Sequence, residues 1–179
     1  GYSKIKKQSW RSSWLDLSLA NEVLRQKLNG KWRNQLKSSE KANLEFKVSG
    51  LKDDLVWLTN KYLVFQKQKK FEGIPISILN FFRDKSNRKD QVYTTFAQKD
   101  GIPIAGLIII KHGIACTYVV GWNDKIGRSF YATNFLLWKS IIEMKKIGCK
   151  WFDLGGLNED LYYDITRFKN GLGGCKYKL

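Results

Sequence analysis

The sequence predicts an α/β fold of the α+β type, a mixed and mainly antiparallel sheet flanked by helices. Three observations predict it. Apolar residues make up 43% of the 179 residues, which is enough material for one hydrophobic core. Segments with strand-like alternation follow one another between 92 and 121, as in an antiparallel meander. Segments with helical three-to-four spacing lie before and after them, and helices that pack on such a sheet complete its layers.

The first part of the chain predicts strand, helix, strand and helix in that order. A short strand at 14–17 precedes Ser18, which is placed to cap the following helix. Apolar residues recur at helical spacing up to Leu36, and Gly30 marks a point where this helix kinks or divides. The alternation at 44–48 predicts a half-buried strand.

A second long helix is predicted to begin at Asp53 and Asp54, because acidic groups suit the positive end of a helix. It ends in lysines, which suit the negative end. A short helix containing Ile78, Leu79 and Phe82 and a polar loop at 84–90 come next.

The second part of the chain predicts the meander, a central helix and a closing unit. Asp100-Gly101 is a hairpin signal, and His112-Gly113 marks another turn. The predicted elements are strands at 92–98, 104–111 and 115–121, a helix at 129–146, a strand at 151–154, a helix at 162–170 and a strand at 176–179. This order matches the GNAT acyltransferase fold, in which the strand after the central helix splays away and opens an acyl-donor cleft.

The charge favours a polyanionic partner. Lysine and arginine total 32 against 16 acidic residues, a formal net charge of +16. Such a field attracts RNA, anionic lipid surfaces or substrates carried on nucleotides, although a merely solubilising surface would have the same sign. Residues 1–9 predict a basic N-terminal arm ahead of a domain at 10–179, since they carry three lysines and few apolar residues.

Composition argues against several classes of protein. No run approaches the roughly 18 apolar residues of a membrane span, and no signal peptide is recognisable at the start. We therefore expect a cytoplasmic protein, with peripheral contact at an anionic inner-membrane surface as an alternative. Three scattered cysteines and one histidine predict no metal site. No Ser-His-Asp or Cys-His grouping suggests a covalent intermediate.

Two C-terminal motifs carry the functional signal. In the first, Trp151-Phe152-Asp153-Leu154-Gly155-Gly156-Leu157-Asn158, a buried strand ends in a carboxylate and two glycines. The glycines allow backbone N–H groups to approach a ligand closely, or they form an ordinary tight turn. Asp153 is accordingly either a group that orients a reacting amine or a structural carboxylate.

The second motif is Ile165-Thr166-Arg167-Phe168-Lys169-Asn170-Gly171-Leu172-Gly173-Gly174. Two cations flank an aromatic residue before a glycine-rich exit. Arg167 and Lys169 can hold phosphates, and Phe168 can stack on a base. The alternative is a helix C-terminus with dipole-favoured cations and a buried phenylalanine.

Together the motifs resemble the Fem family of peptidoglycan-bridge aminoacyltransferases and related GNAT-like acyltransferases. In that family a "yDLGGi" strand is followed, after a variable loop, by "gi-x-x-FK-x-G-(F/L)-GG", which matches 152–157 and 165–174. The resemblance extends to "vDLs" at 15–18, to the basic stretch at 30–36 and to the central helix at 131–142. It covers nearly the whole chain.

The resemblance implies acyl transfer, in which an amine of a peptidoglycan precursor or a similar acceptor attacks the ester of an aminoacyl-tRNA. It implies that 10–179 corresponds to the second of two GNAT-like domains, with the first lying upstream. Lys169 and Asp153 become the catalytic candidates, and Phe168, Arg167 and Tyr118 become candidates for binding the tRNA acceptor end. No cofactor is expected, since the acyl donor is a co-substrate.

The segment before the central helix departs from GNAT enzymes that use acetyl-CoA. Their pyrophosphate loop is rich in glycine, whereas 123–131 here has only Gly127-Arg128 as a partial match. Arg128 and Tyr131 are further substrate-binding candidates at this place. Two alternatives remain: an N-acyltransferase that uses acyl-CoA or an acyl carrier protein, and a non-catalytic tRNA- or precursor-binding half of a larger enzyme.

Overall fold

A computed structural model describes residues 11–69, 73–75, 77–78, 80–81, 91–158 and 162–179. The strands are β1 (Arg11–Asp16), β2 (Glu45–Ser49), β3 (Val92–Lys99), β4 (Ile102–His112), β5 (Ala115–Asn123), β6 (Trp151–Asp153) and β7 (Cys175–Lys178). The helices are α1 (Asn21–Lys27), α2 (Gly30–Glu40), α3 (Lys52–Lys69), α5 (Lys125–Ser129), α6 (Ala132–Lys146) and α7 (Tyr163–Asn170). The predicted basic arm at 1–9, together with Leu79, Phe82 and 84–90, lies outside the described residues.

The strands form one seven-stranded sheet in the order β2-β3-β4-β5-β6-β1-β7. Every neighbouring pair is antiparallel apart from β5 and β6, which run parallel. The predicted mixed, mainly antiparallel sheet is therefore confirmed. The parallel pair is short, because only 115–117 of β5 is matched with 151–153 of β6 while β5 continues to Asn123.

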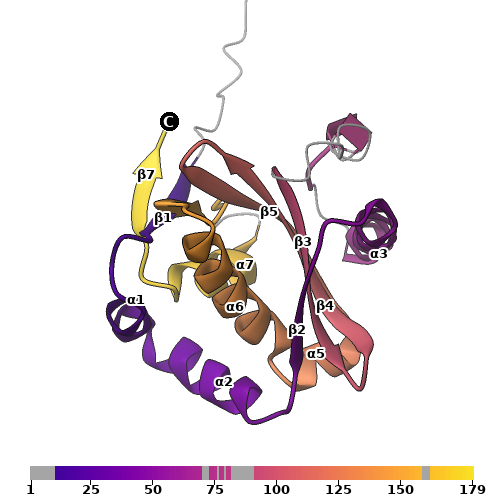
Figure 1. Ribbon diagram of the computed structural model, residues 1–179, viewed down its shortest axis with the longest axis horizontal. Coiled ribbons are helices and arrows are strands. Elements are labelled where there is room, and N and C mark those ends of the chain that lie inside the picture. The colour runs from indigo at the N-terminus through magenta and orange to yellow at the C-terminus, as the bar shows by residue number, and fades with distance from the viewer. Residues whose placement is uncertain (1–10, 70–72, 76, 79, 82–90, 159–161) are drawn as a thin grey trace, which may run out of the picture.

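Helices cover both faces of the sheet. Figure 1 shows α1, α2 and α6 on one side and α3 on the other. The larger core lies on the side of α6, which packs against β3, β4 and β5 and whose residues Leu136, Leu137 and Ile141 are fully buried. A smaller core joins Leu58 of α3 to Ile108 and other residues of the meander. No helix of the described part of the chain has the length and apolar content that a membrane span needs.

The first predicted helix is divided in two. Asn29 caps the start of α2 by accepting a hydrogen bond from the backbone N–H of Trp32 at 2.8 Å, so the break falls one residue before Gly30. The prediction that Ser18 caps α1 is wrong. The cap position is held by Ala20, which makes no side-chain cap bond, and the Ser18 hydroxyl donates to Asp16 at 2.6 Å instead.

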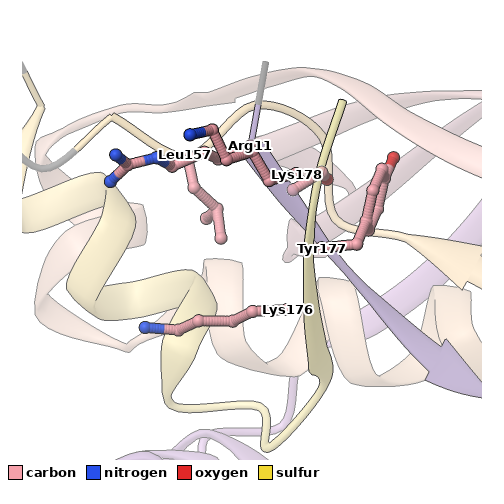
Figure 2. A pocket seen from close by; sticks show the side chains of 6 residues that line it. Arg11, Leu157, Lys176, Tyr177 and Lys178 are labelled. Carbon is pink, nitrogen blue, oxygen red and sulfur yellow. The ribbon is translucent and has the colours of Figure 1, made fainter. Parts of the chain in front are cut away.

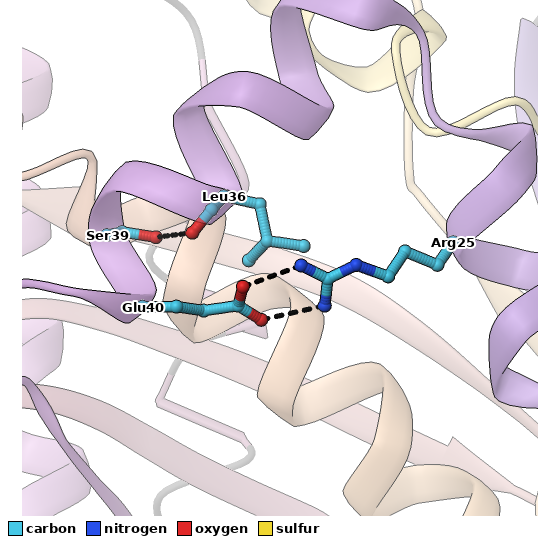
Figure 3. A network of polar contacts seen from close by, with 4 residues as sticks. All are labelled: Arg25, Leu36, Ser39 and Glu40. Carbon is cyan, nitrogen blue, oxygen red and sulfur yellow. Dashed lines mark hydrogen bonds and ion pairs between the residues drawn. The ribbon is translucent and has the colours of Figure 1, made fainter.

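A salt bridge between α1 and the end of α2 holds the two short helices together. The Arg25 guanidinium donates to both carboxylate oxygens of Glu40, at 2.8 and 2.6 Å (Figure 3). These hydrogen bonds lower the pKa of Glu40 and raise that of Arg25. The Ser39 hydroxyl donates to the Leu36 carbonyl within the same turn. This layer of helices packs against α6.

The meander follows the sequence pattern closely. Asp100 and Gly101 both have positive φ, at 52° and 76°, which is the conformation of the predicted two-residue hairpin turn. The predicted central helix is interrupted near its start: α5 begins at Lys125, and Tyr131, with φ at 51°, separates it from α6. His112 belongs to β4, so the second turn begins at Gly113.

Candidate functional site

The candidate site lies where β5 and β6 separate. Gly155 lies two residues after the end of β6 and has a φ of 71°. A Cβ at this position would lie 2.6 Å from the carbonyl oxygen of Tyr118 in β5. Only glycine combines this left-handed conformation with such a close approach of two backbones. The glycine pair therefore carries the chain away from β5 at the point where strand pairing stops.

Asp153 is held by three hydrogen-bond donors. The Ser12 hydroxyl and the Gly155 N–H, at 2.7 Å, donate to Oδ1, and the Tyr177 hydroxyl donates to Oδ2 at 2.7 Å. Ser12 and Tyr177 face each other across the β1–β7 pair, so antiparallel register brings both hydroxyls to the same carboxylate. Donors on both oxygens fix the orientation of the carboxylate.

Lys169 is a buried cation in the same place. It comes from the last turn of α7, and only 8% of its surface is exposed. Its ammonium donates to the Gly156 carbonyl at 3.0 Å and lies 5.4 Å from the centre of the Tyr118 ring. Burial lowers the pKa of Lys169 to about 8, and the Asp153 charge acts in the opposite direction.

This arrangement suits a reaction in which negative charge develops on oxygen. With a pKa of about 8, Lys169 is mostly protonated near pH 7, yet it loses its proton more readily than an exposed lysine. A desolvated ammonium interacts strongly with a nearby oxyanion, because little water screens the attraction. The same group can release a proton to a leaving oxygen.

Tyr118 forms one wall of the site. It is half-buried and packs against the larger core, and burial raises the pKa of its phenol above the ordinary value. A Cβ on Gly121 would lie 1.9 Å from the Tyr118 hydroxyl, so the end of the Tyr118 ring occupies the space that a side chain at position 121 would fill. Tyr118 is therefore a neutral surface under the Lys169 ammonium.

The side chains of Phe168 and Arg167 have different surroundings from that of Lys169. The Phe168 ring is half-buried and packs against Trp32 of α2, with centroids 5.7 Å apart. Arg167 is exposed in the last turn of α7. Packing of α7 on α2 accounts for the position of Phe168, and its role in stacking on a base stays a prediction.

Arg128 and Tyr131 lie at the start of the central helix, and the described contacts join neither of them to Lys169. Arg128 is exposed and donates to the Asn123 carbonyl at 3.3 Å, and Tyr131 is 40% exposed. The Asp124 carboxylate accepts from the Gly127 N–H at 2.6 Å. A carboxylate thus occupies a backbone donor of the segment in which CoA-using relatives bind pyrophosphate.

Sequence reasoning missed Ser12 and Tyr177. Ser12 lies 141 residues from Asp153 in the chain, and Tyr177 lies 24 residues from it. Neither stands in a recognisable motif. Only the register of β1 with β7 could have identified them, and the sequence pattern of two short strands does not determine that register.

Similar folds occur among solved structures. A crystal structure of FemX matches with a TM-score of 0.81 at 11% identity, over 94% of this chain and 59% of that chain. The C-terminal domain of a putative lysylphosphatidylglycerol synthetase from Agrobacterium fabrum matches with a TM-score of 0.65 at 15% identity, over 94% and 58%. L-PGS from Bacillus licheniformis gives 0.62 at 13%, also over 94% and 58%. The fold is thus FemX-like, of the GNAT-like type, and this chain spans about three fifths of each of these proteins.

Sequence comparison gives the family. No curated protein matches the chain. The profile of the FemAB family matches residues 42–179, which include β6, α7 and both C-terminal motifs. Since this match covers well over half of the sequence, the chain belongs to the FemAB family.

Proposed function

We propose that this chain is an acyltransferase domain that forms an amide bond. It transfers an aminoacyl group from aminoacyl-tRNA to an amine of a peptidoglycan precursor or a similar acceptor. The observation that carries the proposal is Lys169, a nearly buried cation at the splayed strands of a FemAB-family fold. The net charge of +16 supports a large anionic donor.

The reaction needs positioning and charge stabilisation. The neutral acceptor amine attacks the ester carbonyl carbon, and the carbonyl oxygen becomes an oxyanion. Collapse of this intermediate forms the amide and breaks the bond to the ribose oxygen, which takes up a proton as the amine nitrogen loses one. In the proposal the Lys169 ammonium stabilises the oxyanion and can protonate the leaving oxygen.

Asp153 has a positioning role in this proposal. Ser12, Gly155 and Tyr177 already donate to its two oxygens, which leaves it poorly suited to remove a proton from the amine. Instead its negative charge favours the ammonium form of Lys169. Its bond to Gly155 also fixes the turn whose next carbonyl, that of Gly156, accepts from Lys169.

The geometry supports tRNA over acyl-CoA as the donor. Asp124 is the N-cap of α5, and its carboxylate accepts from the Gly127 N–H. A negative carboxylate at this place would repel a pyrophosphate. Gly127 is itself buried, and a Cβ on it would lie 2.2 Å from the Ile104 carbonyl oxygen. This segment is therefore packed against β4 and does not form an open anion-binding loop.

The acceptor has a second candidate. Two of the similar structures carry the names lysylphosphatidylglycerol synthetase and L-PGS. Their folds resemble this one, and a basic surface would also attract an anionic lipid. A phosphatidylglycerol acceptor is therefore the alternative against which the amine acceptor has to be tested.

The test compares Lys169→Met with Lys146→Met, which removes an exposed lysine from the end of α6. Binding of an aminoacylated RNA microhelix is measured by fluorescence anisotropy, and transfer of a labelled aminoacyl group is measured with amine and phosphatidylglycerol acceptors. We expect Lys169→Met to lower the transfer rate at least about 100-fold, with Lys146→Met near the wild type.

The tRNA proposal would be overturned if acyl-CoA protected the protein from thermal unfolding while the charged RNA did not bind. Transfer to the lipid alone would replace the amine acceptor. RNA binding without transfer to either acceptor would support the non-catalytic half of a larger enzyme.

A further inference from the structure

A small basic pocket lies beside the β1–β7 edge of the sheet. It has a volume of about 260 Å³ and is lined by Arg11, Ser12, Leu157, Lys176, Tyr177 and Lys178. Figure 2 shows the Arg11 and Lys176 side chains on one side of β7 and the Tyr177 ring on the other. The lining residues include three cations and no acidic side chain.

Strand register brings these cations together. Arg11 pairs with Lys178, and Ser13 pairs with Lys176, so all three cations project from the same face of two hydrogen-bonded strands. Like charges directly opposite each other across an antiparallel pair are destabilising. Neither Arg11 nor Lys178 forms an ion pair with an acidic residue in the described part of the chain. An anion between them would relieve this repulsion.

The pocket has fixed walls. The Leu157 N–H donates to the Arg11 carbonyl at 2.8 Å, which fastens the wall formed by Leu157 to β1. On the opposite face of the same two strands, the Ser12 and Tyr177 hydroxyls donate to Asp153, which holds β1 and β7 in place. Cations on paired strands lose less freedom on binding a ligand than cations on a loop.

We propose that this pocket binds a compact, multiply charged phosphate group of the diphosphate type. Its volume accommodates a diphosphate but is small for a whole nucleotide, so the remainder of a larger ligand would lie outside. The Arg11 guanidinium can hold two phosphate oxygens at once, and the lysines act as point charges. Arg11 and Lys178 alone carry two charges, more than the single charge of one phosphodiester, which favours a diphosphate over an RNA backbone.

The pocket adjoins the site of the proposed transfer but does not depend on it. Leu157 follows Gly156, whose carbonyl binds Lys169, so one short segment borders both places. Binding of a diphosphate can be measured without any aminoacyl donor. A failure of the transfer assay and a failure of this proposal are therefore separate results.

Calorimetric titration with inorganic pyrophosphate at low salt tests the proposal. The double variant Arg11→Gln/Lys178→Gln is compared with Lys37→Gln/Lys41→Gln, which removes two exposed cations at the end of α2. We expect saturable binding by the wild type, a rise in Kd of about ten-fold or more in the pocket variant, and little change in the control. Orthophosphate should bind more weakly than pyrophosphate, and a nucleoside diphosphate at least as tightly.

Three results would overturn the proposal: no saturable pyrophosphate binding, equal losses in both double variants, or a loss confined to a short RNA without terminal phosphate. The second result would show only the general positive field. The third would assign the pocket to an RNA strand. Unfolding temperatures of all variants without ligand show that each variant is folded.

Discussion

Lys169 places an ammonium group where little water can reach it. Its lowered pKa, about 8 against an ordinary value near 10.4, corresponds to about 3 kcal/mol of cost for holding the charged form in the fold. The Gly156 carbonyl and the Tyr118 ring compensate only part of the lost hydration. A group kept at such a cost is more consistent with chemistry than with stability.

Lys169→Met is therefore expected to stabilise the fold near pH 7. Between about pH 8 and pH 10.4 the unfolded chain binds a proton on Lys169 that the folded chain has lost, so the stability of the wild type rises with pH in this window. The gain from methionine should be about 1–3 kcal/mol near pH 7 and should shrink towards pH 10. Urea unfolding at both pH values measures it, and a loss of stability near pH 7 would mean that Lys169 is chiefly structural.

The residues of the site differ in how far the sequence could predict them. Asp153 and Lys169 were candidates because each stands in a motif with local spacing, and the structure places both at the β5–β6 splay. Ser12 and Tyr177 depend on contacts between strands from opposite ends of the chain. Phe168 stands in a motif, but the sequence does not show that its ring packs on Trp32. That contact follows from the arrangement of α7 on α2, which no local pattern reveals.

At the scale of elements, the predictions were most accurate where contacts are local. The meander was predicted because alternation and the Asp100-Gly101 turn are properties of neighbouring residues. The divided helices were predicted less well. Gly30 suggested a division that Asn29 in fact makes, and the break at Tyr131 left no signal, since a tyrosine with positive φ is uncommon. The surrounding structure imposes that conformation.

The turn after β6 can be tested with two glycines. Gly155 and Gly113 have similar φ values, 71° and 63°, but a Cβ meets the Tyr118 carbonyl only at Gly155 and meets nothing within 4 Å at Gly113. Gly113→Ala should cost about 1 kcal/mol, from the backbone conformation alone. Gly155→Ala should cost roughly 2 kcal/mol or more, because the strands must also move apart.

Urea unfolding of the two alanine variants gives these costs. Gly155→Ala should also impair transfer beyond its effect on folding, because the Gly156 carbonyl that holds Lys169 would move with the turn. Equal costs for the two variants would show that the close approach of Gly155 to β5 is unimportant.

At the scale of the whole molecule, the fold has two cores of different size on one sheet. The larger core fixes β4, β5, β6 and α6, which form the base of the site. The smaller core under α3 lies beneath the meander. The site is built at the junction of the large core with the β1–β7 edge, so the packed core positions Lys169. The chain as a whole carries a net charge of +16.

That charge should make binding of an RNA donor strongly dependent on salt. A protein that contacts six or more phosphates loses roughly 1,000-fold or more in affinity between about 50 and 200 mM salt, because bound counterions are released.

Arg167→Gln, at an exposed position next to the site, should reduce the slope of log K against log salt by about one. Lys37→Gln, on α2, should change it little if the RNA lies over α7. Anisotropy titrations across this range measure both slopes. Affinity that does not vary with salt would contradict an electrostatic mode of binding, and equal slopes for the two variants would mean that the RNA does not contact Arg167.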